Sequence, residues 1–140
     1  MPPILTLTDA PDDAARAVVG NGLAAFNEEQ TGISDVRPIA VLISDPDTGA
    51  IVGGLIGRTS LGLMFIDLVY IPDRFRGARL GSEMLAMAEA EARRRGCCSV
   101  LLVTISFQAP GFYAKHGYTE LGRVPCHPPG TSRVLMSKAL

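Results

Sequence analysis

Two apolar runs, joined through a glycine- and arginine-rich loop and a helix, constrain the fold of this chain more than any other feature. The first run spans residues 63–71 and the second spans residues 99–105. The second run carries no charged residue, which is typical of a strand buried on both faces. Two strands connected through one crossover helix pair in parallel. We therefore predict a parallel strand pair, 63–71 with 99–105.

The segments around this pair predict further strands and helices. Residues 39–44 and 51–58 flank the turn at 45–49 and form a hairpin, and a second turn at 61–62 leads into 63–71, giving three antiparallel strands. Toward the N-terminus we expect a strand at 4–8, then a helix that Asp9 or Asp12 caps and that Gly20 and Gly22 break or kink, then a loop at 27–37. After the parallel pair's first strand we expect a helix from Ser82 to the arginine run at 93–95, which acts as a solvated cap. The last expected elements are a short helix at 110–116 and strands at 118–121 and 131–138.

Composition limits the class of protein. The chain has 140 residues, of which 47% are hydrophobic, so we expect a single globular domain over 1–140. A net charge of −1 gives no general attraction to nucleic acid, and the arginines are not interleaved with aromatic residues, so we expect no nucleic-acid partner. No apolar run reaches the roughly 20 residues that a bilayer requires, and the N-terminus lacks a signal peptide pattern. We expect a cytoplasmic protein with no membrane partner.

The cysteines do not indicate a metal. Cys97 and Cys98 are adjacent and Cys126 stands alone, which matches neither a zinc-ligand spacing nor an even disulfide set. We therefore expect three buried thiols and no metal site.

The loop at residues 71–82 carries the strongest chemical signal. It joins a strand to a helix, contains small residues that let a backbone approach closely, and adds the charges of Arg74, Arg76 and Arg79. Free N–H groups and the dipole at a helix start favour an anion such as a pyrophosphate. The loop lacks the ending of an ATP-binding P-loop and the three-glycine dinucleotide pattern, which argues against nucleotide hydrolysis and hydride transfer.

A second stretch, residues 109–118, places Tyr113 on a short helix directly after the second apolar run. Because parallel strands end at the same edge of a sheet, where ligands gather, we expect Tyr113 to meet residues 76–82 there. The alternative is that Phe112 and Tyr113 only pack against the sheet, which we expect for Phe112.

Together these stretches resemble the GNAT superfamily of N-acetyltransferases over about residues 63–121. The coenzyme loop of that superfamily reads Arg/Gln-x-x-Gly-x-Gly/Ala; Arg76 and Gly81 match it, whereas Arg79 stands where the middle glycine would be. In the later motif, Ser106 occupies the asparagine position, and the matching residues are Ala109, Phe112, Tyr113, Gly117 and Tyr118. The resemblance implies an α/β (α+β) fold whose mixed, mostly antiparallel sheet splays at the parallel pair and is flanked by helices.

The resemblance also implies a coenzyme, acetyl-CoA, and the residues that bind it. The pantetheine arm would lie between the splayed strands and bind the backbone of residues 69–71, with a Val69 N–H stabilising the oxyanion. The residues that this assigns to coenzyme binding are Val69, Tyr70, Ile71, Arg76, Gly77, Ala78, Arg79, Leu80, Gly81, Ser82 and Ser106. Gln108 can compensate for the missing asparagine, and Lys115 can reach the phosphates.

Two side chains are candidates for the proton transfers. Tyr113 matches the tyrosine that protonates the departing thiolate in the superfamily. Asp67 is the candidate base for the attacking amine, because by strand alternation it shares a side with Val69 and an apolar strand raises a carboxyl pKa. The alternatives for Asp67 are an ion pair with an arginine or solvation. His116, next to a helix-ending glycine, is expected to be exposed, and His127 to lie in a loop.

The sequence therefore predicts an acyltransferase that moves acetyl from acetyl-CoA to an amine of a small molecule or a peptide by direct attack. The alternative is a non-catalytic acyl-CoA-binding module, which the departures at Arg79 and Ser106 favour and Tyr113 opposes. By analogy with the superfamily, the last strand, 134–137, can pair two chains as a homodimer.

Overall fold

The computed structural model describes residues 1–77 and 79–140, and the coenzyme contact expected of Ala78 lies outside them. By internal packing the described chain divides into two units, 1–34 and 35–140, and each is described by itself. The prediction of a single domain over 1–140 stays a prediction. The elements are α1 (Asp13–Thr31), β1 (Arg37–Ser44), β2 (Ile51–Ser60), β3 (Leu63–Tyr70), the 3-10 turn η1 (Asp73–Phe75), α2 (Leu80–Arg94), β4 (Ser99–Ile105), α3 (Pro110–Lys115), β5 (Thr119–Pro125) and β6 (Ser132–Ala139).

The first unit is one helix with an extended segment before it. Asp12 caps α1 as expected, because its carboxylate accepts the N–H of Ala15 at 2.7 Å. Three expectations were wrong: α1 continues through Gly20 and Gly22, it extends to Thr31 into the loop expected at 27–37, and residues 4–8 form no strand. A glycine inside a helix costs only about 1 kcal/mol and removes no hydrogen bond, so the helix persists. Among the described residues, no strand pairs with 4–8, and an unpaired strand is not stable.

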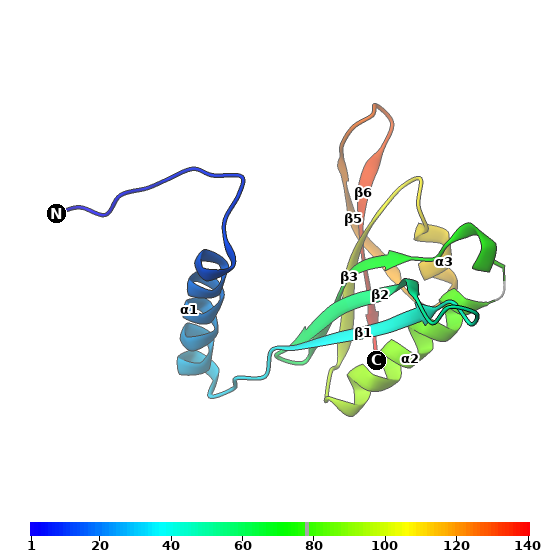
Figure 1. The fold of residues 1–140 in the computed structure, drawn as a ribbon, viewed down its shortest axis with the longest axis horizontal. Helices are drawn as coiled ribbons and strands as arrows, with labels where there is room; N and C mark the ends of the chain where they lie inside the picture. Colours follow the sequence, from blue (N-terminus) through cyan, green and yellow to red (C-terminus); the bar gives the residue numbers. More distant parts are fainter. Residues whose placement is uncertain (78) are drawn as a thin grey trace. The chain divides into compact units, whose positions relative to one another are not determined.

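The second unit contains a six-stranded sheet in the order β1-β2-β3-β4-β6-β5, drawn as one twisted layer in Figure 1. The predicted parallel pair is confirmed, since β3 and β4 run in parallel while the other neighbours are antiparallel. The last strand, β6, lies between β4 and β5 with hydrogen-bonded partners on both sides. In this sheet β6 therefore has no free edge to offer a second chain, since the edges are β1 and β5, and the homodimer expected by analogy stays a prediction.

Helices α2 and α3 pack against the same face of the sheet and bury the core there. The core residues alternate along the strands, as in Met64 and Ile66 of β3 or Val134 and Met136 of β6. Their partners are apolar positions of α2, together with Tyr113 of α3. None of the helices in the described ranges combines the length and the apolar character needed to cross a bilayer.

A charged side chain is buried within this core. Glu89 of α2 is only 5% exposed, and its carboxylate accepts hydrogen bonds from Tyr118 Oη at 2.7 Å and from Lys138 Nζ at 2.8 Å. Burial, together with the bond to Glu89, raises the pKa of Tyr118. The three residues tie α2 to the start of β5 and the end of β6, and they satisfy the charge that burial would otherwise leave unpaired.

Strands β3 and β4 separate because β3 contains a bulge. Gly57 of β2 pairs with Ile66 and Ile56 pairs with Leu68, so Asp67 is an extra, unpaired residue. The pairing of β3 with β4 ends at Ile66. Beyond that point the two strands diverge, as the splayed sheet implied by the superfamily resemblance requires.

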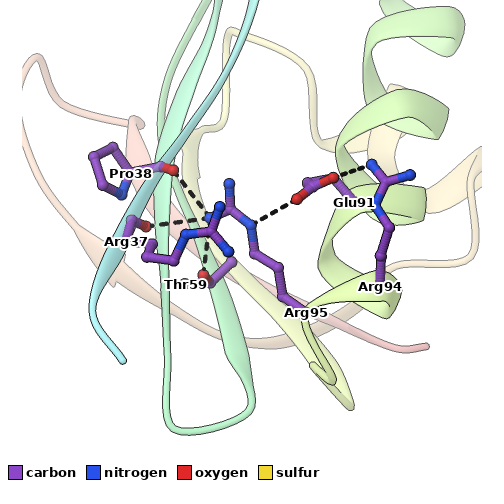
Figure 2. Close-up of polar contacts among 6 residues, drawn as sticks. All are labelled: Arg37, Pro38, Thr59, Glu91, Arg94 and Arg95. Atoms are coloured by element: carbon purple, nitrogen blue, oxygen red, sulfur yellow. Dashed lines mark hydrogen bonds and ion pairs between the residues drawn. The ribbon is translucent and has the colours of Figure 1, made fainter. Parts of the chain in front are cut away.

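Arg95, at the end of α2, anchors this helix to the sheet, as Figure 2 shows. Its guanidinium donates to Pro38 O at 2.9 Å, to Thr59 Oγ1 at 3.1 Å and to Glu91 at 2.9 Å. The side chain is only 12% exposed, so the expected solvated arginine cap was wrong for this residue. Hydrogen bonds from Arg94 and Arg95 lower the pKa of Glu91 to about 2, which keeps the anchor charged in mild acid.

Candidate active site

A cavity of about 740 Å³ opens where β3 and β4 separate, and α2 and α3 contribute to its walls. That volume lies within the range of roughly 300–1,000 Å³ typical of small-molecule sites. The predicted site residues that line it are Asp67, Val69, Tyr70, Ile71, Arg76, Gly81 and Tyr113. The structure thus brings the two sequence stretches together at one cavity.

The start of α2 faces this region with unused backbone donors. Arg79 is the N-cap residue and makes no capping hydrogen bond with its side chain in the described structure. Among the described contacts, no side chain accepts a hydrogen bond from the N–H groups of Leu80, Gly81 or Ser82. A helix of 15 residues places a positive dipole end at this point, so an anion is stabilised beside Leu80, Gly81 and Ser82.

The three arginines of the loop differ in their contacts. Arg74 pairs with Asp45 of the β1–β2 turn at 2.9 Å, so its charge supports the loop. Arg76 lines the cavity, donates Nε–H to Ile71 O at 2.9 Å and pairs with Asp73. Arg79 is exposed and takes part in none of the ion pairs of the described residues. Of these three arginines, Arg79 is the one without an ion-pair partner among the described residues, whereas Arg76 lines the cavity with its guanidinium paired to Asp73.

Gly81 leaves little room for a side chain. A Cβ at this position would lie 3.1 Å from Cζ of Phe112 and 3.4 Å from Cδ1 of Ile71. Phe112 stacks on His116 and meets Tyr113 edge to face, so it has little room to move. Phe112 of α3 thus packs against Gly81 of α2, in agreement with the packing role expected of Phe112.

Tyr113 lies at the cavity with its ring fixed. Its side chain is 6% exposed, and it packs edge to face against Phe112 and Tyr118 at centroid distances of 5.3 and 5.5 Å. Burial raises the pKa of the Tyr113 phenol, because it disfavours the phenolate. The phenol is thus a proton donor that stays protonated at neutral pH.

Comparisons with known proteins agree with this geometry. The model of the Acetyltransferase (GNAT) family matches residues 11–118. The chain belongs to the GNAT acetyltransferase family. It is 34% identical to an acetyltransferase of Agrobacterium fabrum over 83% of this chain and 84% of that protein. It is also 34% identical to the blasticidin-S acetyltransferase of Streptomyces morookaense, over 100% of this chain and 98% of that protein.

Solved structures give the same family. A structure from Agrobacterium tumefaciens has a TM-score of 0.87 at 31% identity, covering 98% of this chain and 99% of that one. An acetyltransferase from Bacillus cereus has a TM-score of 0.76 at 28% identity, covering 96% and 98%. The chain is therefore an acyltransferase, and GNAT enzymes use acetyl-CoA as the acetyl donor.

The described coenzyme-loop residues fit that donor, with one departure. Where the GNAT loop has its middle glycine, Arg79 has φ 61° and ψ 16°, the left-handed conformation that glycine adopts without strain. A side chain in that conformation costs about 1–2 kcal/mol. Arg79 thus adopts a backbone conformation that suits the glycine of the GNAT pattern, although the residue has changed.

This strain predicts the effect of restoring the glycine. We expect Arg79→Gly to raise the free energy of unfolding by up to about 1 kcal/mol relative to Arg79→Ala, because alanine keeps the strained Cβ. Both variants lack the guanidinium, so their difference isolates the backbone effect. Urea unfolding of the pair measures it. Equal stabilities would mean that the left-handed conformation at residue 79 stores no strain.

Ser106 contacts protein backbone. Its Oγ accepts the N–H of Ser132 at 3.0 Å, and the Ser106 N–H donates to Ser132 O at 2.9 Å, which joins the end of β4 to the start of β6. Gln108, the expected substitute, lines the cavity, and its side-chain oxygen accepts the Ile105 N–H at 3.0 Å. Gln108 therefore stands nearer to the expected coenzyme contact than Ser106 does.

Asp67 forms an ion pair in the structure. Its carboxylate lies 2.7 Å from Arg58, whose guanidinium also stacks 4.3 Å from the centroid of the Phe65 ring. The pair is about half exposed, at 47% and 45% of the two side chains. The ion pair foreseen as an alternative is thus present. The bulge breaks the strand alternation from which Asp67 was expected to share a side with Val69, so that expectation was wrong, and the base role of Asp67 stays a prediction.

Sequence reasoning missed the contacts of His116. We expected an exposed side chain, but His116 is half-buried, its Nδ1 lies 2.8 Å from Phe112 O, and its Nε2 lies 2.9 Å from Ser82 Oγ. The i, i+4 spacing of Phe112 and His116 on a helix was the available signal. Only the fold brings Ser82 within reach. Two of the cysteine expectations also differ, since Cys98 is exposed and Cys126 half-buried, while Cys97 is buried.

Proposed function

We propose that this enzyme is an N-acetyltransferase that transfers acetyl from acetyl-CoA directly to an amine of a small molecule or peptide. The observation that carries the proposal is the cavity between the separated ends of β3 and β4, with Tyr113 in its wall and the start of α2 beside it. Most residues that line the cavity are apolar, as suits a pantetheine arm, and Arg76 and Gly81 are among the others.

The donor is proposed to bind with its arm along β3. Backbone groups of residues 69–71 would pair with the arm as a neighbouring strand does, and a Val69 N–H would stabilise the oxyanion. The N–H groups at the start of α2, with Arg76 and Arg79, would bind the pyrophosphate. These roles rest on the family pattern and on the exposure of this backbone beyond the bulge.

Direct attack is favoured by the composition of the cavity wall. No cysteine is among the described residues that line it, so no thiol is available there to carry the acetyl group. The amine nitrogen would form the new bond to the acetyl carbon while the C–S bond breaks. Tyr113 would give its proton to the departing thiolate, and Asp67 or a water would take the proton of the amine.

A small-molecule amine is the acceptor that the comparisons favour. The blasticidin-S acetyltransferase is similar to this chain from end to end. The ribosomal-protein-S18-alanine N-acetyltransferase of Escherichia coli and the NatC complex bound to Gag peptide and CoA are similar in fold alone, at 16% and 14% identity. We therefore propose that small-molecule amines, blasticidin S among them, be tested before peptides.

Calorimetric titration with acetyl-CoA and a thiol-release assay over a panel of amines test the proposal. We expect saturable binding that free CoA competes with, and CoA release that depends on one class of amine. Binding without turnover of any amine or peptide would favour a non-catalytic acyl-CoA-binding module. Absence of binding by the folded protein would overturn the proposal.

A further inference from the structure

We propose that His116 is a positioning residue for the coenzyme, and that its charge decides whether the Ser82 hydroxyl donates to a coenzyme phosphate or to His116. This inference rests on the proposed function, because it concerns the phosphate end of the same site. It is carried by the two hydrogen bonds of His116, at 2.8 Å to Phe112 O and at 2.9 Å to Ser82 Oγ.

The partner of Nδ1 determines the tautomer of the neutral ring. A carbonyl oxygen such as Phe112 O can only accept a hydrogen bond, so Nδ1 must carry the proton. Nε2 is then an acceptor, and the Ser82 hydroxyl must donate to it. Ser82 has one hydroxyl hydrogen, so in this state it has none left for an anion at the start of α2.

Protonation of His116 reverses the second bond. With both nitrogens carrying hydrogen, Nε2–H donates to Ser82 Oγ, and the hydroxyl hydrogen becomes free to turn toward a phosphate oxygen. Ser82 is the third residue of α2, in the turn whose N–H groups have no side-chain cap. The hydroxyl would thus add to the donors that already favour an anion there.

Other charged groups lie on the elements around His116, but none of them is hydrogen-bonded to Ser82 among the described contacts. Lys138 of β6 lies close to the backbone after His116, about 3.9 Å from a Cβ placed on Gly117, but its charge is paired with Glu89 at 2.8 Å. The other charged or titratable side chains on the elements around His116 are Tyr113 and Lys115 of α3, Tyr118 just before β5, Glu120 and Arg123 of β5, Arg133 of β6, Arg79 at the N-cap of α2, and Glu83, Glu91, Arg93 and Arg94 of α2. Among the described contacts, both ring nitrogens of His116 are engaged only by Phe112 and Ser82.

The test uses dephospho-CoA, whose pyrophosphate does not titrate near neutrality, so that any pH dependence belongs to the protein. We expect its affinity to rise about tenfold between about pH 8 and about pH 5.5, the size of one hydrogen bond to a charged group. His116→Gln should remove this dependence, whereas His127→Gln, in the loop between β5 and β6, should retain it. Acetyl-pantetheine, which lacks the pyrophosphate, should bind equally at both pH values.

The Ser82→Ala variant separates the effect of the Ser82 hydroxyl on binding from the effect of the His116 charge. We expect this variant to lose most of the pH dependence; if it keeps the full tenfold change, the charge of His116 acts through space and the proposal is wrong. Because the chain has two histidines, NMR follows both. The titration midpoint of His116 should move to higher pH when dephospho-CoA binds, by reciprocity of linkage. An unmoved midpoint overturns the inference, whereas absence of binding at every pH overturns the proposed function instead.

Discussion

Tyr113→Phe is expected to lower kcat by about 100-fold or more while changing the affinity for acetyl-CoA little, since general-acid catalysis contributes roughly that factor. Phenylalanine keeps the edge-to-face contacts with Phe112 and Tyr118 and removes only the hydroxyl. Because burial raises the pKa of Tyr113 above its ordinary value of 10.0, the wild type should show no loss of kcat from phenol ionisation below about pH 10. Steady-state kinetics over pH measure both effects.

The other tyrosines provide matched controls, since the chain has three. Tyr118→Phe removes a hydroxyl that donates to the buried Glu89, so it should lower the melting temperature and leave kcat within a few-fold. Tyr70→Phe alters a second phenol that lines the cavity. If Tyr70→Phe lost the rate and Tyr113→Phe did not, the acid would be Tyr70, and the role proposed for Tyr113 would be wrong.

The order of strands around the site followed from local sequence signals. Turn residues at 45–49 and 61–62 separate apolar runs, and a helix of sufficient length joins 63–71 to 99–105, so hairpins and the parallel pair were predictable. The N-terminal errors have the opposite cause. Residues 4–8 alternate like a strand but have no partner strand, and two glycines lowered helix propensity without preventing the helix.

The site itself was less predictable, because its contacts join residues distant in sequence. Motif positions indicated Arg76, Gly81 and Tyr113, and all three line one cavity. No local pattern predicted the contact of Ser82 with His116, which are 34 residues apart. The ion pair of Asp67 with Arg58 likewise depends on the register of β2 with β3. Hydrophobic periodicity predicts which face of a helix or strand is buried. It does not predict the register between two elements, on which such residue pairs depend.

The position of β6 between β4 and β5 also could not be predicted from the local sequence pattern. Apolar alternation predicted a strand at 131–138 and its buried face, but a strand inside a sheet and a strand at its edge have the same alternation. The interior position of β6 matters for assembly, because only an edge strand can pair directly with a second chain. A homodimer through residues 134–137 would require β5 to leave the sheet.

Gly57→Ala is the second change from which we expect a large effect, because it acts on the bulge that separates β3 from β4. A Cβ on Gly57 would lie 2.1 Å from the carbonyl oxygen of Phe65 and 3.1 Å from its carbon. Both atoms are backbone, so no side-chain rotation relieves the contact, and β2 must move away from β3. We expect a loss of about 3 kcal/mol in the free energy of unfolding, equivalent to a fall of about 10 °C in melting temperature.

Gly122→Ala is the matched control, since Gly122 is also a strand glycine beside a register shift, in β5, and a Cβ there meets nothing within 4 Å. We expect its stability to change by less than about 0.5 kcal/mol. Thermal unfolding of both variants, with acetyl-CoA titrated into each folded form, measures stability and cavity together. If Gly57→Ala were as stable as Gly122→Ala and bound acetyl-CoA normally, the bulge at Asp67 would not require a glycine opposite it. The separation of β3 and β4 would then have to depend on the α2 and α3 contacts at Gly81 instead.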